Sequence, residues 1–116
     1  MKLSTRLSAL VALGLSVVAP KPQASEALPQ PVVHAAHCII VFAVGNEKKV
    51  PLPNSRGRSG HEIGQFYGRI VSPYDGLGHL EALAAKYTPI YMGLPNAEIR
   101  NRAQSCIEHM IRQQAR

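Results

Sequence analysis

Histidine and cysteine are concentrated in one short segment of the chain. His34, His37 and Cys38 lie within five residues (HAAHC) and form the only dense group of transition-metal ligand types. On a helix, His34 and Cys38 share a face, whereas His37 points about 60° away from His34. One hypothesis is therefore a transition-metal binder that uses His34 and His37. A tetrahedral site would need a further ligand, such as His61, His79, His109 or Cys106.

The chain has two cysteines, Cys38 and Cys106. An even number of cysteines in an oxidising compartment favours a disulfide. This bridge would close a loop of nearly seventy residues, which the chain-entropy model values at roughly 4 kcal/mol. An oxidised Cys38 cannot act as a thiolate ligand, so the disulfide competes with the metal site. Two free thiols and a Cys/His metal site are the alternatives.

Few residues are arranged for catalysis. Ser105 and His109 are one helical turn apart and give a further hypothesis, a small hydrolase, but a triad also needs an orienting acid and oxyanion donors. The acidic residues are not paired at a spacing typical of acid–base chemistry. The chain has no glycine-rich phosphate loop, zinc-protease motif or haem-attachment motif. The sequence therefore favours a non-enzymatic protein without a cofactor.

The first 27 residues have the three-part organisation of a secretory signal peptide. Lys2 and Arg6 precede the apolar run 7–18, and a segment with small residues ends at Ala27. The apolar run is shorter than the roughly 20 residues that span a bilayer. We expect cleavage after Ala27, which leaves residues 28–116 as a single small helical domain in the periplasm or outside the cell.

The predicted mature chain, residues 28–116, is mildly basic. It has ten lysines and arginines and six acidic residues, a net charge of +4. This charge permits contact with an acidic protein or an anionic lipid surface, but it is far from the strongly basic signature of nucleic-acid binding. Export makes a nucleic-acid partner less plausible still.

Basic side chains cluster in the polar loop 47–60 and on one border of the C-terminal segment. Such charges usually form a solvated surface. The functional alternative is a binding surface for another protein of the cell envelope, with lipid as the weaker candidate. The leading hypothesis is thus an exported, non-enzymatic interaction protein. Its candidate binding residues are Lys48, Lys49, Arg56, Arg58, Arg102, His109 and Arg116.

The pattern of apolar residues predicts four helices. The segment 32–44 is apolar almost all round, and without a convincing partner strand it is expected to be a buried helix. Ser59 and Glu62 form a capping box before a helix over 61–72. A third helix is expected over 79–87, ended by Pro89, and a fourth over 97–114 with Asn96 as its N-cap. The sequence predicts a small all-α domain whose first and last helices are joined by the disulfide.

The last predicted helix combines an apolar stripe with two charge pairs. The stripe is formed by Ile99, Ala103, Cys106, Ile107, Met110 and Ile111. Glu98 with Arg102, and Glu108 with Arg112, have the i, i+4 spacing of helical ion pairs.

Three glycines are spaced four residues apart along the second helix. Glycine in a helix interior costs about 1 kcal/mol relative to alanine. Gly60, Gly64 and Gly68 therefore predict a stripe where another helix of the same domain packs closely. The alternative is a partner interface, including a homodimer through the face of Gly64 and Gly68.

Overall fold

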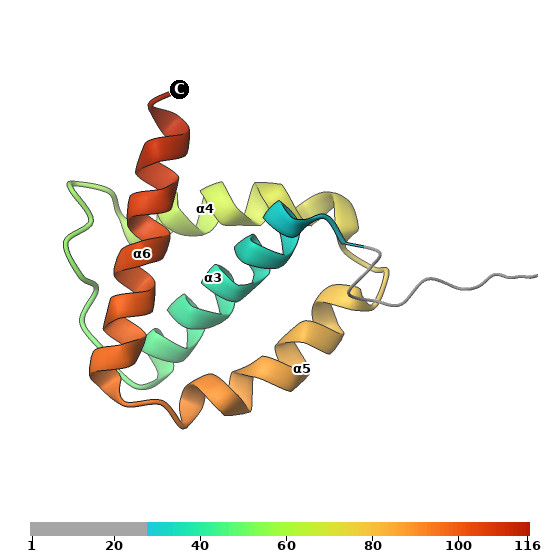
Figure 1. Cartoon of the computed structure of the whole chain (residues 1–116), viewed down its shortest axis with the longest axis horizontal. Helices are drawn as coiled ribbons and strands as arrows, with labels where there is room; N and C mark the ends of the chain where they lie inside the picture. The colour runs from blue at the N-terminus through green and yellow to red at the C-terminus, as the bar shows by residue number, and fades with distance from the viewer. Residues whose placement is uncertain (1–27) are drawn as a thin grey trace, which may run out of the picture.

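The computed structural model describes residues 28–116, which form four α-helices and one short 3₁₀-helix (Figure 1). No residue in this range forms a β-strand. The predicted all-α fold with four helices is confirmed. The predicted signal peptide, residues 1–27, lies outside the described residues. The elements are α3 (Gln30–Glu47), α4 (Gly60–Val71), η2 (Ser72–Tyr74), α5 (His79–Met92) and α6 (Asn96–Gln114).

Helix α3 is the centre of the domain, and α4, α5 and α6 all pack against it (Figure 1). Its N-terminal half packs with Tyr67 of α4 and Ile107 of α6. Its C-terminal half packs with Tyr91 of α5 and Ile99 of α6. The almost uniform apolarity of the segment 32–44 is thus explained, because a helix with partners on several sides needs apolar residues around most of its circumference.

The disulfide joins the first and last of these helices, as predicted. The Cα atoms of Cys38 and Cys106 are 5.9 Å apart, within the usual range for a disulfide. Both cysteines are buried, at 1% and 6% exposure. The bridge links α3 to α6 across 68 residues of sequence.

Helix α3 ends in a motif that holds the following loop. The backbone N–H of Val50 donates to the carbonyl of Gly45, and that of Lys49 donates to the carbonyl of Asn46. These two bonds form a Schellman motif, which needs a residue in the left-handed conformation. Lys49 adopts it, with a φ of 58°. The loop therefore leaves α3 in a defined direction.

Helix α4 has the predicted capping box, and it begins and ends one residue earlier than predicted. The Ser59 hydroxyl accepts a hydrogen bond from the backbone N–H of Glu62, and the Glu62 carboxylate accepts one from the N–H of Ser59, each at 3.0 Å. This capping box satisfies two of the free N–H groups at the helix start. Ile63, Tyr67 and Val71 are buried on one face of α4.

The predicted end of the third helix is wrong, because α5 continues through Pro89 to Met92. Pro89 lacks the N–H that would bond to the preceding turn, but only three helical residues follow it. Tyr91 is 7% exposed, and its hydroxyl lies 2.6 Å from Nδ1 of His37 on α3. These tertiary contacts hold the last turn against the local effect of proline.

Helix α6 has the predicted apolar stripe but differs at two points. Its N-cap is Pro95, with Asn96 as the first helical residue, and no side chain caps it. The predicted Glu98–Arg102 ion pair is present at 3.1 Å. Instead of pairing with Arg112, Glu108 accepts a hydrogen bond from Nε2 of Gln104 at 3.1 Å.

No helix in the described range 28–116 combines the length and apolarity needed to cross a bilayer.

Candidate functional site

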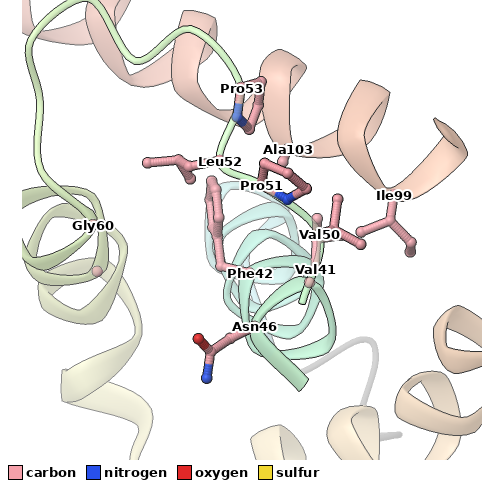
Figure 2. A pocket seen from close by; sticks show the side chains of 12 residues that line it. Val41, Phe42, Asn46, Val50, Pro51, Leu52, Pro53, Gly60, Ile99 and Ala103 are labelled. Atoms are coloured by element: carbon pink, nitrogen blue, oxygen red, sulfur yellow. The ribbon is translucent and has the colours of Figure 1, made fainter. Parts of the chain in front are cut away.

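A cavity of about 380 Å³ lies between α3, the loop 48–59, the start of α4 and α6 (Figure 2). Its lining is mainly apolar, with Val41 and Phe42 from α3 and Ile99 and Ala103 from α6. Val50–Pro53 of the loop close another side, and the amide of Asn46 adds a polar group. This volume is within the range of roughly 300 to 1,000 Å³ that is typical of ligand pockets.

The loop that closes the cavity is anchored to the helices. Nε2 of Gln104 on α6 donates to the carbonyl of Asn54 at 3.2 Å. The Asn54 side chain accepts a hydrogen bond from the N–H of Arg56, at 3.0 Å. Leu52 at the cavity is 46% exposed. The loop is thus a defined wall that presents an apolar side chain to solvent.

Gly60 and Gly64 form part of the cavity wall. A Cβ atom at Gly60, Gly64 or Gly68 would have no atom within 4 Å outside its own helix and chain neighbours. The prediction that another helix of the same domain packs closely on this stripe is therefore wrong. The stripe faces open space, and its alternative use as a partner or homodimer interface stays a prediction.

Two of the predicted binding residues act inside the structure. Nζ of Lys48 donates to the carbonyls of Met92, the last residue of α5, and Leu94, which satisfies backbone groups at and just after the helix end. Arg102 pairs with Glu98, and its guanidinium lies 5.3 Å from the ring centroid of Tyr91. Lys48 and Arg102 therefore contribute to the fold, whatever else they do.

The remaining basic residues of the loop lie next to the cavity wall in sequence. Lys49 and Arg56 are exposed, and Arg58 is half-buried. All three belong to the loop whose residues Val50–Pro53 line the cavity. The structure thus brings an apolar cavity and a short group of positive charges onto one segment.

His109 and Arg116 do not extend this basic loop. Burial lowers the pKa of His109, and the charges of His34, Arg112 and Arg116 lower it further, so a positive charge on His109 is disfavoured. Gln114, the last residue of α6, lies about 16 Å along the helix axis from Ala103 in the cavity wall. Arg116 is two residues further on and is remote from the cavity.

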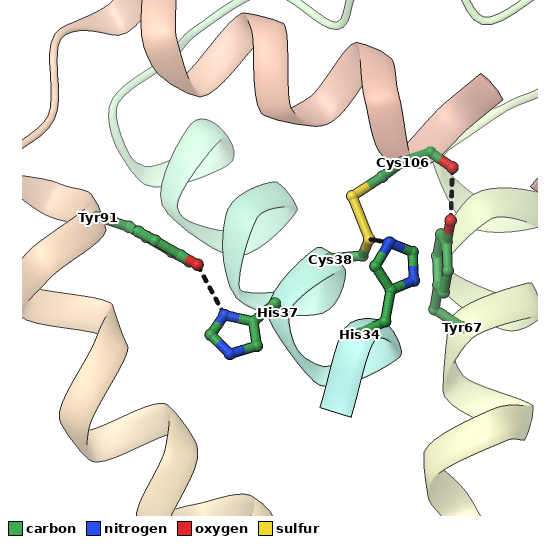
Figure 3. Close-up of a disulfide and its surroundings, with 6 residues drawn as sticks. All are labelled: His34, His37, Cys38, Tyr67, Tyr91 and Cys106. Atoms are coloured by element: carbon green, nitrogen blue, oxygen red, sulfur yellow. Dashed lines mark hydrogen bonds between the residues drawn. A yellow bond between two sulfur atoms is a disulfide. The ribbon is translucent and has the colours of Figure 1, made fainter. Parts of the chain in front are cut away.

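A second group of chemically active side chains surrounds the disulfide (Figure 3). Nε2 of His34 is 3.6 Å from Sγ of Cys38. The ring of His34 lies 4.4 Å from that of His109 and 6.1 Å from that of Tyr67, between centroids. The Tyr67 hydroxyl donates to the carbonyl of Cys106, and burial raises the pKa of Tyr67 to about 12. Tyr67 is therefore a neutral hydrogen-bond donor that links α4 to α6.

His37 lies on another side of α3 from His34 (Figure 3). It bonds to the Tyr91 hydroxyl, and its ring centroid is 4.4 Å from that of Tyr87. Burial lowers the pKa of His37, and the charges of His34 and Arg102 lower it further. The two histidines thus have separate partners, and the geometry does not favour a metal held by His34 and His37 together.

The hydrolase hypothesis rested on Ser105 and His109. Ser105 is exposed, whereas the His109 ring packs against His34 and stacks with Tyr67 at 6.5 Å. The structure therefore brings His109 to the disulfide cluster and describes no orienting acid for it.

Sequence reasoning missed the roles of Tyr67 and Tyr91. A tyrosine on a buried face is the available signal, because a buried hydroxyl needs a hydrogen-bond partner. The partners come from helices distant in sequence, so the pairs could not be identified.

Comparison with known proteins gave no relative. No protein-family model, curated protein or solved structure matches this chain. The cavity, its basic loop and the disulfide cluster are therefore the basis for assigning a function.

Proposed function

We propose that this chain is an exported, non-enzymatic binding protein that holds a segment of another cell-envelope protein. The observation that carries the proposal is the apolar cavity of about 380 Å³ beside the basic loop. Ligand sites combine a mainly apolar concave surface with a few polar groups that fix orientation. Here the side chain of Asn46 supplies a neutral amide in the cavity lining, and Lys49, Arg56 and Arg58 supply charge on the adjoining loop, outside the lining.

The surface fits a partner with an apolar anchor and acidic neighbours. Apolar side chains inserted into the cavity would contact Val41, Phe42 and Ile99. Carboxylates beside them would face the positive charges of the loop. This attraction would speed association and fix how the partner segment is aligned on the surface. A peptide segment provides both features within a few residues.

A protein partner is favoured over a lipid surface by the number of available charges. Polybasic lipid-binding segments use clusters of about four to eight lysines and arginines. In the described loop, Lys48 is already bonded to the carbonyls of Met92 and Leu94. Lys49, Arg56 and Arg58 remain, which is too few for a typical lipid-binding cluster.

Export is supported by two separate features. Residues 1–27 have the composition of a signal peptide. The buried disulfide between Cys38 and Cys106 is typical of an oxidising compartment. We place the protein in the periplasm or outside the cell.

The proposal is tested by capture from an envelope extract with charge-reversal variants. The double variant Arg56→Glu/Arg58→Glu should lose roughly tenfold in capture, which corresponds to about 1.4 kcal/mol. Its thermal unfolding should change little, because neither arginine has an ion-pair partner among the described residues. Arg116→Glu is the matched control, since it reverses a charge remote from the cavity.

Two results would contradict the proposal. One is equal capture by the wild type and the Arg56→Glu/Arg58→Glu variant. The other is an equal loss with Arg116→Glu, which would indicate a response to overall charge alone. Vesicles of anionic phospholipid form a parallel arm, and binding to them with the same dependence on Arg56 and Arg58 would assign the surface to lipid.

A further inference from the structure

The disulfide holds together two ligand pairs from facing helices. Helix α3 contributes His34 and Cys38, four residues apart, and α6 contributes Cys106 and His109, three residues apart. Both spacings place the two side chains of a pair on one face of a helix. His34, Cys38 and Cys106 therefore meet at one point between α3 and α6, with His34 directly beside the bridge (Figure 3). The ring of His109 lies beside that of His34.

The distances fit a tetrahedral metal ion once reduction lets the two sulfur atoms, which are bonded to each other in the structure, move apart. The ligand atoms of His34, Cys38 and Cys106 all lie within 4.8 Å of one another, and Nε2 of His34 is 3.6 Å from Sγ of Cys38. Zinc bonds of about 2.3 Å to sulfur and 2.0 Å to nitrogen place neighbouring ligand atoms roughly 3.3 to 3.8 Å apart. The ring of His109, 4.4 Å from that of His34 between centroids, can supply the fourth ligand.

We infer that the chain with its disulfide reduced binds one Zn²⁺ through Cys38, Cys106, His34 and His109. A dithiol reductant donates two electrons and two protons. The S–S bond breaks, two thiols form, and the reductant becomes a disulfide. Binding of Zn²⁺ then releases the two thiol protons to solvent, and the oxidation state of zinc does not change. The inference is independent of the proposed binding function.

The surroundings support a site with one open side. Cys38 and Cys106 are buried, so their thiolates would be shielded from solvent, whereas His34 is exposed and offers a path for the ion. Tyr67 bonds to the carbonyl of Cys106 and stacks with the ring of His109 at 18°. Tyr67 thereby positions both ligands of α6, as residues around metal ligands commonly do.

The test uses Co²⁺ as a spectroscopic probe for zinc in the full chain, reduced and kept free of oxygen. We expect one Co²⁺ per chain, with the strong visible absorption of a tetrahedral ion and a thiolate-to-cobalt charge-transfer band, and displacement by Zn²⁺. The disulfide-bonded protein should show no charge-transfer band. His34→Ala and His109→Ala should weaken binding at least about tenfold, and the matched control His37→Ala should bind as the wild type does.

A second measurement covers the effect of reduction on folding. If reduction lowers the helix signal in far-ultraviolet circular dichroism, metal binding and folding are coupled. We then expect Zn²⁺ to restore the helix signal of the wild type but not that of His34→Ala. The inference is overturned if the reduced chain binds no stoichiometric Co²⁺ or if Zn²⁺ does not restore lost helix. It is also overturned if His37→Ala weakens binding as much as His34→Ala.

Discussion

Lys48 shows how a side chain predicted as part of a binding surface can instead complete a helix end. Its ammonium group donates to the carbonyls of Met92 and Leu94, 44 and 46 residues away in sequence. No local pattern around Lys48 indicates these partners. The same holds for Tyr67, whose hydroxyl bonds to the carbonyl of Cys106. Local spacing predicted the Glu98–Arg102 pair, whereas it gave no indication of these long-range partners.

The conformation of Lys49 leads to a stability prediction. A residue with a side chain in the left-handed region costs roughly 1 kcal/mol more than glycine, and Lys49 has a φ of 58°. Lys49→Gly should raise the free energy of unfolding by about 1 kcal/mol, measured from the urea midpoint. Lys86→Gly, the same substitution within α5, should lower it by a similar amount. A lower midpoint for Lys49→Gly would contradict the assignment of the Schellman motif.

The open glycines of α4 lead to a second prediction. Because a Cβ at Gly64 or Gly68 meets no atom within 4 Å, replacement by alanine should add helix propensity without a clash. Each variant should gain up to about 1 kcal/mol in thermal or urea unfolding. Gly78→Ala is the opposite control, because Gly78 has a φ of 85° and should be destabilised by alanine. A loss of stability in Gly64→Ala would restore the hypothesis of close packing.

At the scale of elements, the helices with strong local signals could be predicted. The capping box and apolar face of α4 fix its start and its buried side, and the apolar stripe of α6 fixes which face meets α3. The all-round apolarity of α3 predicted burial, and the absence of a partner strand decided its type. The prediction was wrong at the end of α5, where the contact of Tyr91 with His37 comes from another helix.

Replacement of Pro89 tests the extended α5. In a continuous helix, alanine at this position supplies an N–H for the carbonyl of Ala85 and removes a steric conflict. Pro89→Ala should therefore raise the free energy of unfolding by about 1 to 3 kcal/mol, as measured by urea denaturation. Pro95→Ala, at the N-cap of α6, serves as the comparison and should change stability much less. An unchanged midpoint for Pro89→Ala would indicate that α5 ends before Pro89.

At the scale of the whole molecule, the all-α fold and its disulfide could be predicted, whereas the cavity could not. The disulfide followed from the number of cysteines, and the helices followed from local periodicity. The cavity exists because the loop 48–59 folds back against α6, where Gln104 bonds to Asn54. That contact joins residues 50 apart in sequence, so no local pattern indicates it. The sequence therefore predicts the basic residues of the loop as binding candidates but not the apolar cavity next to the loop.

The disulfide should provide a large share of the stability of so small a domain. A disulfide between residues 68 apart in sequence lowers the conformational entropy of the unfolded chain. In the chain-entropy model this stabilises the folded state by roughly 4 kcal/mol. Cys38→Ala/Cys106→Ala should lower the free energy of unfolding by about this amount, measured in urea. Wild type treated with a reductant and a chelator should show a similar loss. A difference below about 1 kcal/mol would contradict a structural role for the bridge.

The most direct test of the proposed binding function is to fill the cavity. Gly64→Leu places a side chain in the cavity, where a Cβ has free space, and Gly68→Leu places the same side chain on the same helix outside the lining. We predict that Gly64→Leu loses about tenfold in partner capture with no loss of thermal stability, while Gly68→Leu captures as the wild type does. Full capture by a stably folded Gly64→Leu protein would contradict the account.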